Sequence, residues 1–123
     1  MTRAGPLAIA NLLITVRAAV AGQPMAPADI QAAFFNGQPF VAAALAGNKF
    51  KMTFTPDGKM TREPLGQSGK PISGTWKLNA KGFCTSWQHA QSNCFTLVPI
   101  GQNRWSVQKI ATTISVSVAT WSK

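Results

Sequence analysis

A strict alternation of apolar and polar residues marks the middle and the end of this 123-residue chain. Phe50, Met52 and Phe54 alternate with lysine and threonine residues, and the same period of two returns over residues 113–118. Successive side chains of a β-strand point to opposite faces, so this spacing predicts strands with one buried and one solvent-facing side. Such strands are stable only when neighbours share the apolar face. The pattern therefore predicts a sheet fold.

Short turn sequences separate the predicted strands. At residues 56–58, Pro-Asp-Gly combines a fixed φ, an aspartate that bonds its own backbone, and a glycine that accepts positive φ. Further turn segments lie at 66–71, 79–82 and 99–103. Short turns favour sequential antiparallel pairing. With a strand near 40–45, about eight strands are expected to form an antiparallel meander that closes into a small barrel; a two-sheet sandwich is the alternative.

A short helix is predicted before the strands. Residues 22–29 form a proline-rich linker, in which Pro27 suits a first helical turn and Asp29 places negative charge at the positive end of the helix dipole. Ile30, Ala33 and Phe34 then share one helical face, and the glycine at position 37 can end the helix. We therefore assign residues 22–38 to a linker and short helix, and residues 39–123 to a single β domain.

The first 21 residues have the features of a signal peptide. Arg3 precedes a mostly apolar run over residues 7–16, and Ala19-Val20-Ala21 has the small-x-small form of a cleavage site. Arg17, between the apolar run and that site, departs from the usual pattern, and a buried or amphipathic N-terminal helix is the alternative. The run is too short for a membrane anchor. We predict cleavage after Ala21 and a periplasmic or secreted protein.

The two cysteines support export. Cys84 and Cys94 flank a polar segment that would turn the chain, and cysteines so placed normally pair in an oxidising compartment. A disulfide is therefore predicted, with two reduced core cysteines as the alternative. One histidine and two cysteines give an incomplete zinc set, and the pair lacks Cys-x-x-Cys spacing. No metal or other cofactor is predicted.

The segment from Phe54 to Trp105 carries a family resemblance. It contains TF-x-PDG, then GTW-x-L-x-x-x-G-x-C-x-x-W, then Asn-Cys-Phe and a tryptophan-containing strand. This order resembles small exported lipocalin-like proteins of Gram-negative bacteria whose function is unknown. The resemblance covers about the middle half of the chain and implies a lipocalin-like barrel. It implies no activity and no ligand-binding residue.

The sequence offers few groups for catalysis. Its acidic residues are Asp29, Asp57 and Glu63, and its one histidine is His89. Acid–base chemistry needs titratable groups placed together, and Asp29 and Asp57 are already explained by a helix and a turn. A triad of His89 with Ser86 or Ser92 has no nucleophile-elbow motif in its support. We predict no catalytic residue and no enzyme.

Two sets of residues are candidates for binding. The first would line the barrel interior, as a ligand site or as ordinary core, and we expect the interior to be filled or nearly filled. This set comprises Phe50, Met52, Phe54, Trp76, Phe83 and Trp87.

The second set is basic and follows from a formal net charge of +9. Such a surface attracts phosphate, lipopolysaccharide or acidic polysaccharide. The alternative is that the charge only keeps the protein soluble. No nucleic-acid-binding module is recognised. The candidate anionic-surface contacts are Lys49, Lys51, Lys59, Arg62, Lys77 and Lys81.

These observations favour a noncatalytic exported barrel, monomeric and without a membrane-spanning segment in its mature form. Its partner would be a small apolar ligand or an anionic component of the cell envelope. A structural or protein-interaction module, such as an inhibitor of the periplasm or envelope, is the competing class. A hydrolase ranks third.

Overall fold

The computed structural model describes residues 22–112 and 114–123. The predicted signal peptide, residues 1–21, lies outside these ranges. Within the described ranges, one helix and eight strands follow one another. They are α1 (Pro27–Phe34), β1 (Phe40–Ala44), β2 (Lys49–Thr55), β3 (Lys59–Leu65), β4 (Ile72–Leu78), β5 (Phe83–Trp87), β6 (Asn93–Gly101), β7 (Arg104–Ile110) and β8 (Ser115–Ser122).

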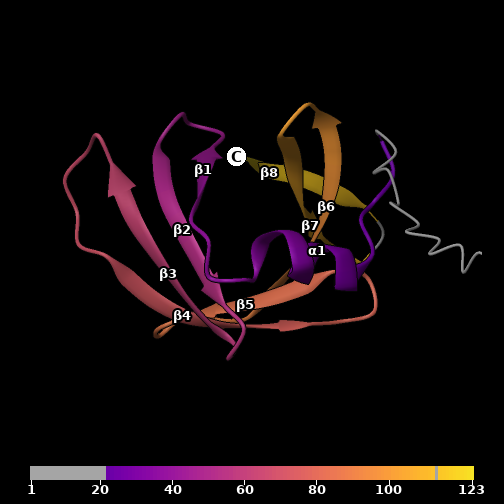
Figure 1. Ribbon diagram of the computed structural model, residues 1–123, viewed down its shortest axis with the longest axis horizontal. Helices are drawn as coiled ribbons and strands as arrows, with labels where there is room; N and C mark the ends of the chain where they lie inside the picture. The colour runs from indigo at the N-terminus through magenta and orange to yellow at the C-terminus, as the bar shows by residue number, and fades with distance from the viewer. Residues whose placement is uncertain (1–21, 113) are drawn as a thin grey trace, which may run out of the picture.

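The eight strands form one closed antiparallel barrel in sequential order (Figure 1). Closure comes from β1, whose Val41 pairs with Lys51 of β2 on one side and with Ser122 of β8 on the other. The predicted barrel is therefore confirmed, and the sandwich alternative is wrong. Closure leaves no long unpaired edge, so each of these short strands is stabilised by a neighbour on both sides.

Helix α1 closes one end of the barrel, in front of the strands in Figure 1. It begins at Pro27 as predicted, and Ile30 and Phe34 are fully buried. A helix of eight residues is too short to be stable alone, so this burial holds it in place. Phe35, directly after the helix, is buried as well. The two phenylalanines enter the barrel and fill that half of its interior.

Aromatic contacts connect the helix to the barrel wall. The Phe34 ring packs edge-on against Phe40 and Trp105, with ring centroids 5.0 and 4.8 Å away. Phe35 contacts Trp76, whose ring centroid lies 4.5 Å away. The indole N–H of Trp76 donates a 2.9 Å hydrogen bond to the carbonyl of Thr55, so its polar atom is satisfied within the core.

The segment predicted as a linker is bound to the barrel wall. The amide of Gly22 donates to the carbonyl of Pro99, and the amide of Met25 donates to that of Leu97. Strand β5 pairs with β6 only between residues 93 and 95, so residues 97–99 of β6 have no partner in β5. Residues 22–25 occupy that edge and lead the chain into α1.

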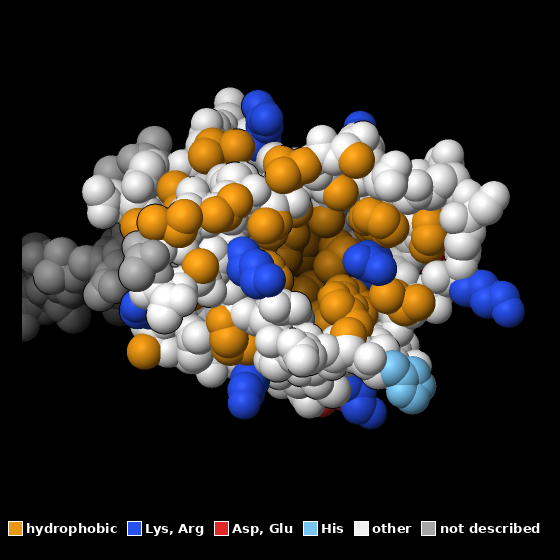
Figure 2. Space-filling model, turned by 180° about the vertical axis from the view of Figure 1, so that it is seen from behind, with side chains coloured by type: hydrophobic (Ala, Val, Ile, Leu, Met, Phe, Trp, Pro, Cys, Tyr) orange, Lys and Arg blue, Asp and Glu red, His pale blue; other side chains and the backbone are white. Residues whose placement is uncertain are grey.

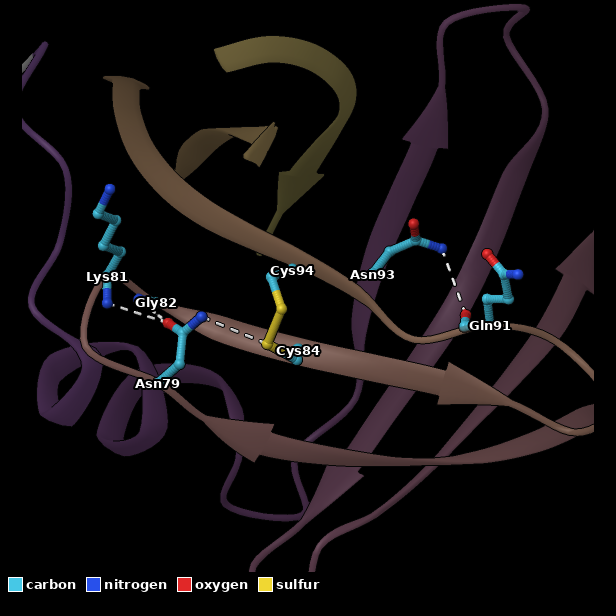
Figure 3. Close-up of a disulfide and its surroundings, with 7 residues drawn as sticks. All are labelled: Asn79, Lys81, Gly82, Cys84, Gln91, Asn93 and Cys94. Atoms are coloured by element: carbon cyan, nitrogen blue, oxygen red, sulfur yellow. Dashed lines mark hydrogen bonds between the residues drawn. A yellow bond between two sulfur atoms is a disulfide. The ribbon is translucent and has the colours of Figure 1, made fainter. Parts of the chain in front are cut away.

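The predicted disulfide is present and joins two neighbouring strands (Figure 3). Cys84 of β5 lies directly opposite Cys94 of β6, with a Cα–Cα distance of 3.9 Å. The β5–β6 ladder has three residue pairs, fewer than any other ladder of the barrel. Beside it, the side-chain amide of Asn79 lies 3.3 Å from the Cys84 sulfur. The covalent bond therefore reinforces the shortest ladder.

Over the described ranges, no helix is both long enough and apolar enough to cross a membrane.

Candidate ligand cavity

The half of the barrel away from α1 contains a cavity of about 210 Å³. Figure 2 views the molecule from the side opposite to Figure 1 and shows a hollow with a hydrophobic lining that opens to solvent. Of the fourteen lining residues, only Arg62 and Thr85 are polar. The cavity is lined by Ala42, Ala44, Phe50, Met52, Phe54, Arg62, Phe83, Thr85, Trp87, Phe95, Val107, Val118, Ala119 and Trp121.

Strand alternation produces this lining. Every second residue of β2 points inward, and Phe54, Phe83 and Trp121 are buried where the cavity meets the filled half of the barrel. Their rings contact one another, with centroids 5.7 Å apart for Phe54 and Trp121 and 5.3 Å apart for Phe83 and Trp121. The aromatic residues therefore form a packed floor, and the space above them is left unfilled.

Most of the residues predicted to line the interior do so. Five of the six, all except Trp76, line the cavity. Trp76 is buried beside Phe35 in the filled half of the barrel. The interior is thus filled at the end that α1 covers and hollow at the other. The expectation of a filled or nearly filled interior is therefore correct only for the half of the barrel that α1 covers.

Arg62 of β3 lies in the cavity wall, where sequence reasoning did not place it. Its guanidinium carbon is 4.7 Å from the centroid of the Phe50 ring and 4.9 Å from that of Trp87. Desolvation by the surrounding side chains lowers the pKa of Arg62 from its ordinary value. The signal was present in the sequence: Arg62 follows Met60 by two residues, and Met60 is buried. From its charge alone, Arg62 is expected on the outer surface, and the structure corrects that expectation.

The other predicted surface cations lie on the neighbouring strands β2, β3 and β4 and in the turn after β4. Lys49 and Lys51 lie on β2, and Lys51 forms a 3.1 Å ion pair with Glu63 of β3. Lys59 and Lys77 lie at exposed positions of β3 and β4, and Lys81 lies in the turn after β4. Arg62 points inward and does not share the outer face of the barrel with these lysines.

The groups considered for catalysis lie apart. Asp29 is in α1, and Asp57 is in the β2–β3 turn, where the Thr55 hydroxyl donates to its carboxylate. This hydrogen bond is the main reason why the pKa of Asp57 is lowered. His89 is exposed in the β5–β6 loop. Within residues 22–112 and 114–123, no three His, Cys, Asp or Glu side chains gather as a potential metal site.

Comparison with known proteins gives no match: no family model, curated protein or solved structure matches the chain. The feature of the molecule that bears on function is the cavity, with its size, its apolar lining and its one charged lining residue.

Proposed function

We propose that this protein is a noncatalytic carrier or receptor that binds a small, largely apolar molecule in the open half of its barrel. The observation that carries the proposal is the cavity of about 210 Å³ with twelve apolar residues among its fourteen lining residues. Ligand sites in proteins are concave and mostly apolar, with a few polar groups that fix orientation. Arg62 and Thr85 are such groups in this cavity.

The size of the cavity limits the size of the ligand. An apolar protein cavity of about 150 Å³ accepts a benzene molecule. At about 210 Å³, the present cavity has room for a single ring with a small substituent, or for a short alkyl chain. Drug-sized ligands occupy sites of roughly 300–1,000 Å³, so heme and whole lipids are excluded as fully enclosed ligands.

Alanines in the lining keep the cavity open. Ala42, Ala44 and Ala119 all line it, on the neighbouring strands β1 and β8. A larger aliphatic side chain at any of these positions would be equally apolar and would fill the space. Aromatic side chains fill the other half of the barrel in this way. Protein interiors are otherwise close-packed. The small residues therefore support a site that receives a ligand.

The proposed setting is the periplasm or the extracellular space. The Cys84–Cys94 disulfide supports it, since stable disulfides are typical of oxidising compartments. The signal-like sequence of residues 1–21 supports it independently. Expression of the full chain in a Gram-negative host, followed by intact-mass analysis of the periplasmic fraction, is expected to show a chain that begins at Gly22. A periplasmic chain that retains Arg3 would contradict the cleavage.

A pair of alanine variants tests the cavity. Ala42 points into the cavity, whereas Ala43 lies on the opposite face of the same strand. Ala42→Leu is expected to weaken binding of toluene by about tenfold or more, since it removes the space that the ring needs. Ala43→Leu adds the same bulk outside and is expected to leave the Kd unchanged.

Toluene binding is measured by titration calorimetry, with circular dichroism as the check that both variants fold. If toluene, indole and hexan-1-ol all fail to bind the parent protein, the proposal is overturned and the protein-interaction class is favoured. Equal losses in Ala42→Leu and Ala43→Leu would also overturn it, because the site would then not be the cavity.

A further inference from the structure

Within residues 22–112 and 114–123, Arg62 is a cation in the cavity wall that forms no ion pair. The chain has three acidic residues, and all are accounted for elsewhere. Asp29 lies in α1 at the closed end, Asp57 accepts a hydrogen bond from Thr55, and Glu63 pairs with Lys51 on the outer face of the barrel. Arg62 is half-buried, and a charged group that is partly withdrawn from water favours a partner. Its guanidinium faces the cavity, where it is free to pair with water or with a ligand.

The contacts that Arg62 does make leave its hydrogen-bond donors available. Phe50 and Trp87 interact with the guanidinium through their rings, at 4.7 and 4.9 Å from the guanidinium carbon. These cation–π contacts offset part of the desolvation but satisfy no N–H group. Among the side-chain hydrogen bonds within the described part of the chain, none involves Arg62. A guanidinium has five such donors in a planar fork.

The aromatic contacts also hold the fork in place. An arginine side chain loses rotamer freedom when it binds, and a partly immobilised one loses less. Because Phe50 and Trp87 themselves line the cavity, the position of Arg62 is fixed relative to the apolar space. The site thus combines an apolar compartment with one preorganised donor group.

The opening of the cavity has a positive character overall. Lys109 follows Val107 by two residues on β7, so strand alternation places it on the inner face, and its side chain is exposed. Figure 2 shows Lys or Arg side chains on both sides of the hollow and no acidic group at its rim. The local charge favours the approach of an anion.

We propose that the ligand is a small monocarboxylate with an apolar body, whose carboxylate is bound by Arg62. This inference rests on the proposed function, since it specifies the chemical class of molecule that the cavity holds. A carboxylate presents two acceptor oxygens in a plane, which matches the arginine fork and allows two parallel hydrogen bonds. The apolar body then contacts the floor formed by Phe54, Phe83 and Trp121.

The test compares ligands that differ only in charge. Benzoate is paired with benzamide, and hexanoate with hexan-1-ol, so that aromatic and aliphatic bodies are tested separately. A charge-assisted bidentate contact is expected to favour each acid over its neutral analogue by about tenfold or more at neutral pH and low salt. Dissociation constants are measured by calorimetry on the full chain.

Three variants locate the effect. Arg62→Met keeps an apolar side chain between Phe50 and Trp87 and is expected to abolish the preference for the acid while the neutral analogue still binds. Arg62→Lys keeps the charge without the fork and is expected to retain a reduced preference. Arg104→Met removes an exposed arginine at the start of β7, outside the cavity, and is expected to change neither constant.

The outcomes separate this inference from the proposed function. Equal affinity for acid and neutral analogue in the parent protein, or an unchanged preference in Arg62→Met, would overturn the carboxylate assignment and leave the apolar cavity intact. Failure of all four compounds to bind a parent protein that still binds toluene would overturn the carboxylate assignment alone, whereas failure of toluene and indole as well would overturn both. Preference for only one acid supports the assignment and identifies whether the body is aromatic or aliphatic.

Discussion

The ring of Phe35 stacks on that of Phe54, with centroids 4.5 Å apart and planes 9° from parallel. Phe35 comes from the segment that follows α1, and Phe54 comes from β2. The contact joins the N-terminal segment to the barrel core. The amide of Gly37 donates a 2.8 Å hydrogen bond to the carbonyl of the same Phe54, which fixes the turn out of the helix.

Removal of the Phe35 ring should destabilise the whole domain. Phe35→Ala is expected to lower the free energy of unfolding by about 3–5 kcal/mol, because a buried ring is lost and a cavity remains. The measurement is urea denaturation followed by tryptophan fluorescence. Leu45→Ala, at a side chain that is 75% exposed, is the matched control and should change stability little. Similar effects of the two variants would contradict the assigned role of Phe35.

The disulfide should contribute most of the stability of the β5–β6 contact. Replacement of both Cys84 and Cys94 by alanine is expected to lower the free energy of unfolding by about 2–4 kcal/mol. Reduction of the parent protein should move its urea midpoint toward that of the variant. The variant itself should not respond to reductant. A parent protein with the same midpoint before and after reduction would show that the bond is dispensable.

A close approach between the backbone just before β5 and strand β6 should make Gly82 sensitive to substitution. A Cβ at Gly82 would lie 2.1 Å from the carbonyl oxygen of Phe95, so backbone would have to move. Gly82→Ala is expected to destabilise the protein by about 1–3 kcal/mol or more. A Cβ at Gly101 would meet no atom within 4 Å, so Gly101→Ala serves as the control. Equal thermal midpoints of the two variants would refute the steric argument.

The Thr55 hydroxyl should control the titration of Asp57. Its hydrogen bond favours the charged carboxylate and lowers the pKa of Asp57, so the associated stabilisation is present above the ordinary pKa and is lost as pH falls through the folded-state pKa. In Thr55→Val, the pKa of Asp57 is expected to rise, as followed by NMR of the side-chain carboxyl carbon. Thr53→Val removes a neighbouring hydroxyl of β2 and should leave that titration unchanged.

The barrel was predictable because its signals are local and repeated. Alternation in β2 and the turn at residues 56–58 each specify a strand face or a reversal, and eight such strands in sequence have few ways to pair. The cysteine pairing was predictable for the same reason, since Cys84 and Cys94 flank one turn. These features depend on neighbours in the sequence.

What escaped prediction depends on contacts between distant segments. Phe35 directly follows the last residue of α1, so helical spacing does not predict where its side chain points. In the structure, the ring is buried inside the barrel. Residues 22–25 have the composition of a linker, and their role appears only where β6 extends beyond β5. Arg62 was assigned to the surface by its charge, although its spacing from Met60 places it inside.

Because α1 fills one end of the barrel, the cavity opens on the face opposite to the helix. A molecule bound there would leave through the opening by which it entered. Its apolar body would enter first and leave last, and an acidic group at the opening would enter last and leave first. A protein that delivers the ligand and a protein that receives it would both have to use this opening, one after the other. Exchange would therefore be sequential, and one large molecule bound over the rim of the hollow would stop it completely.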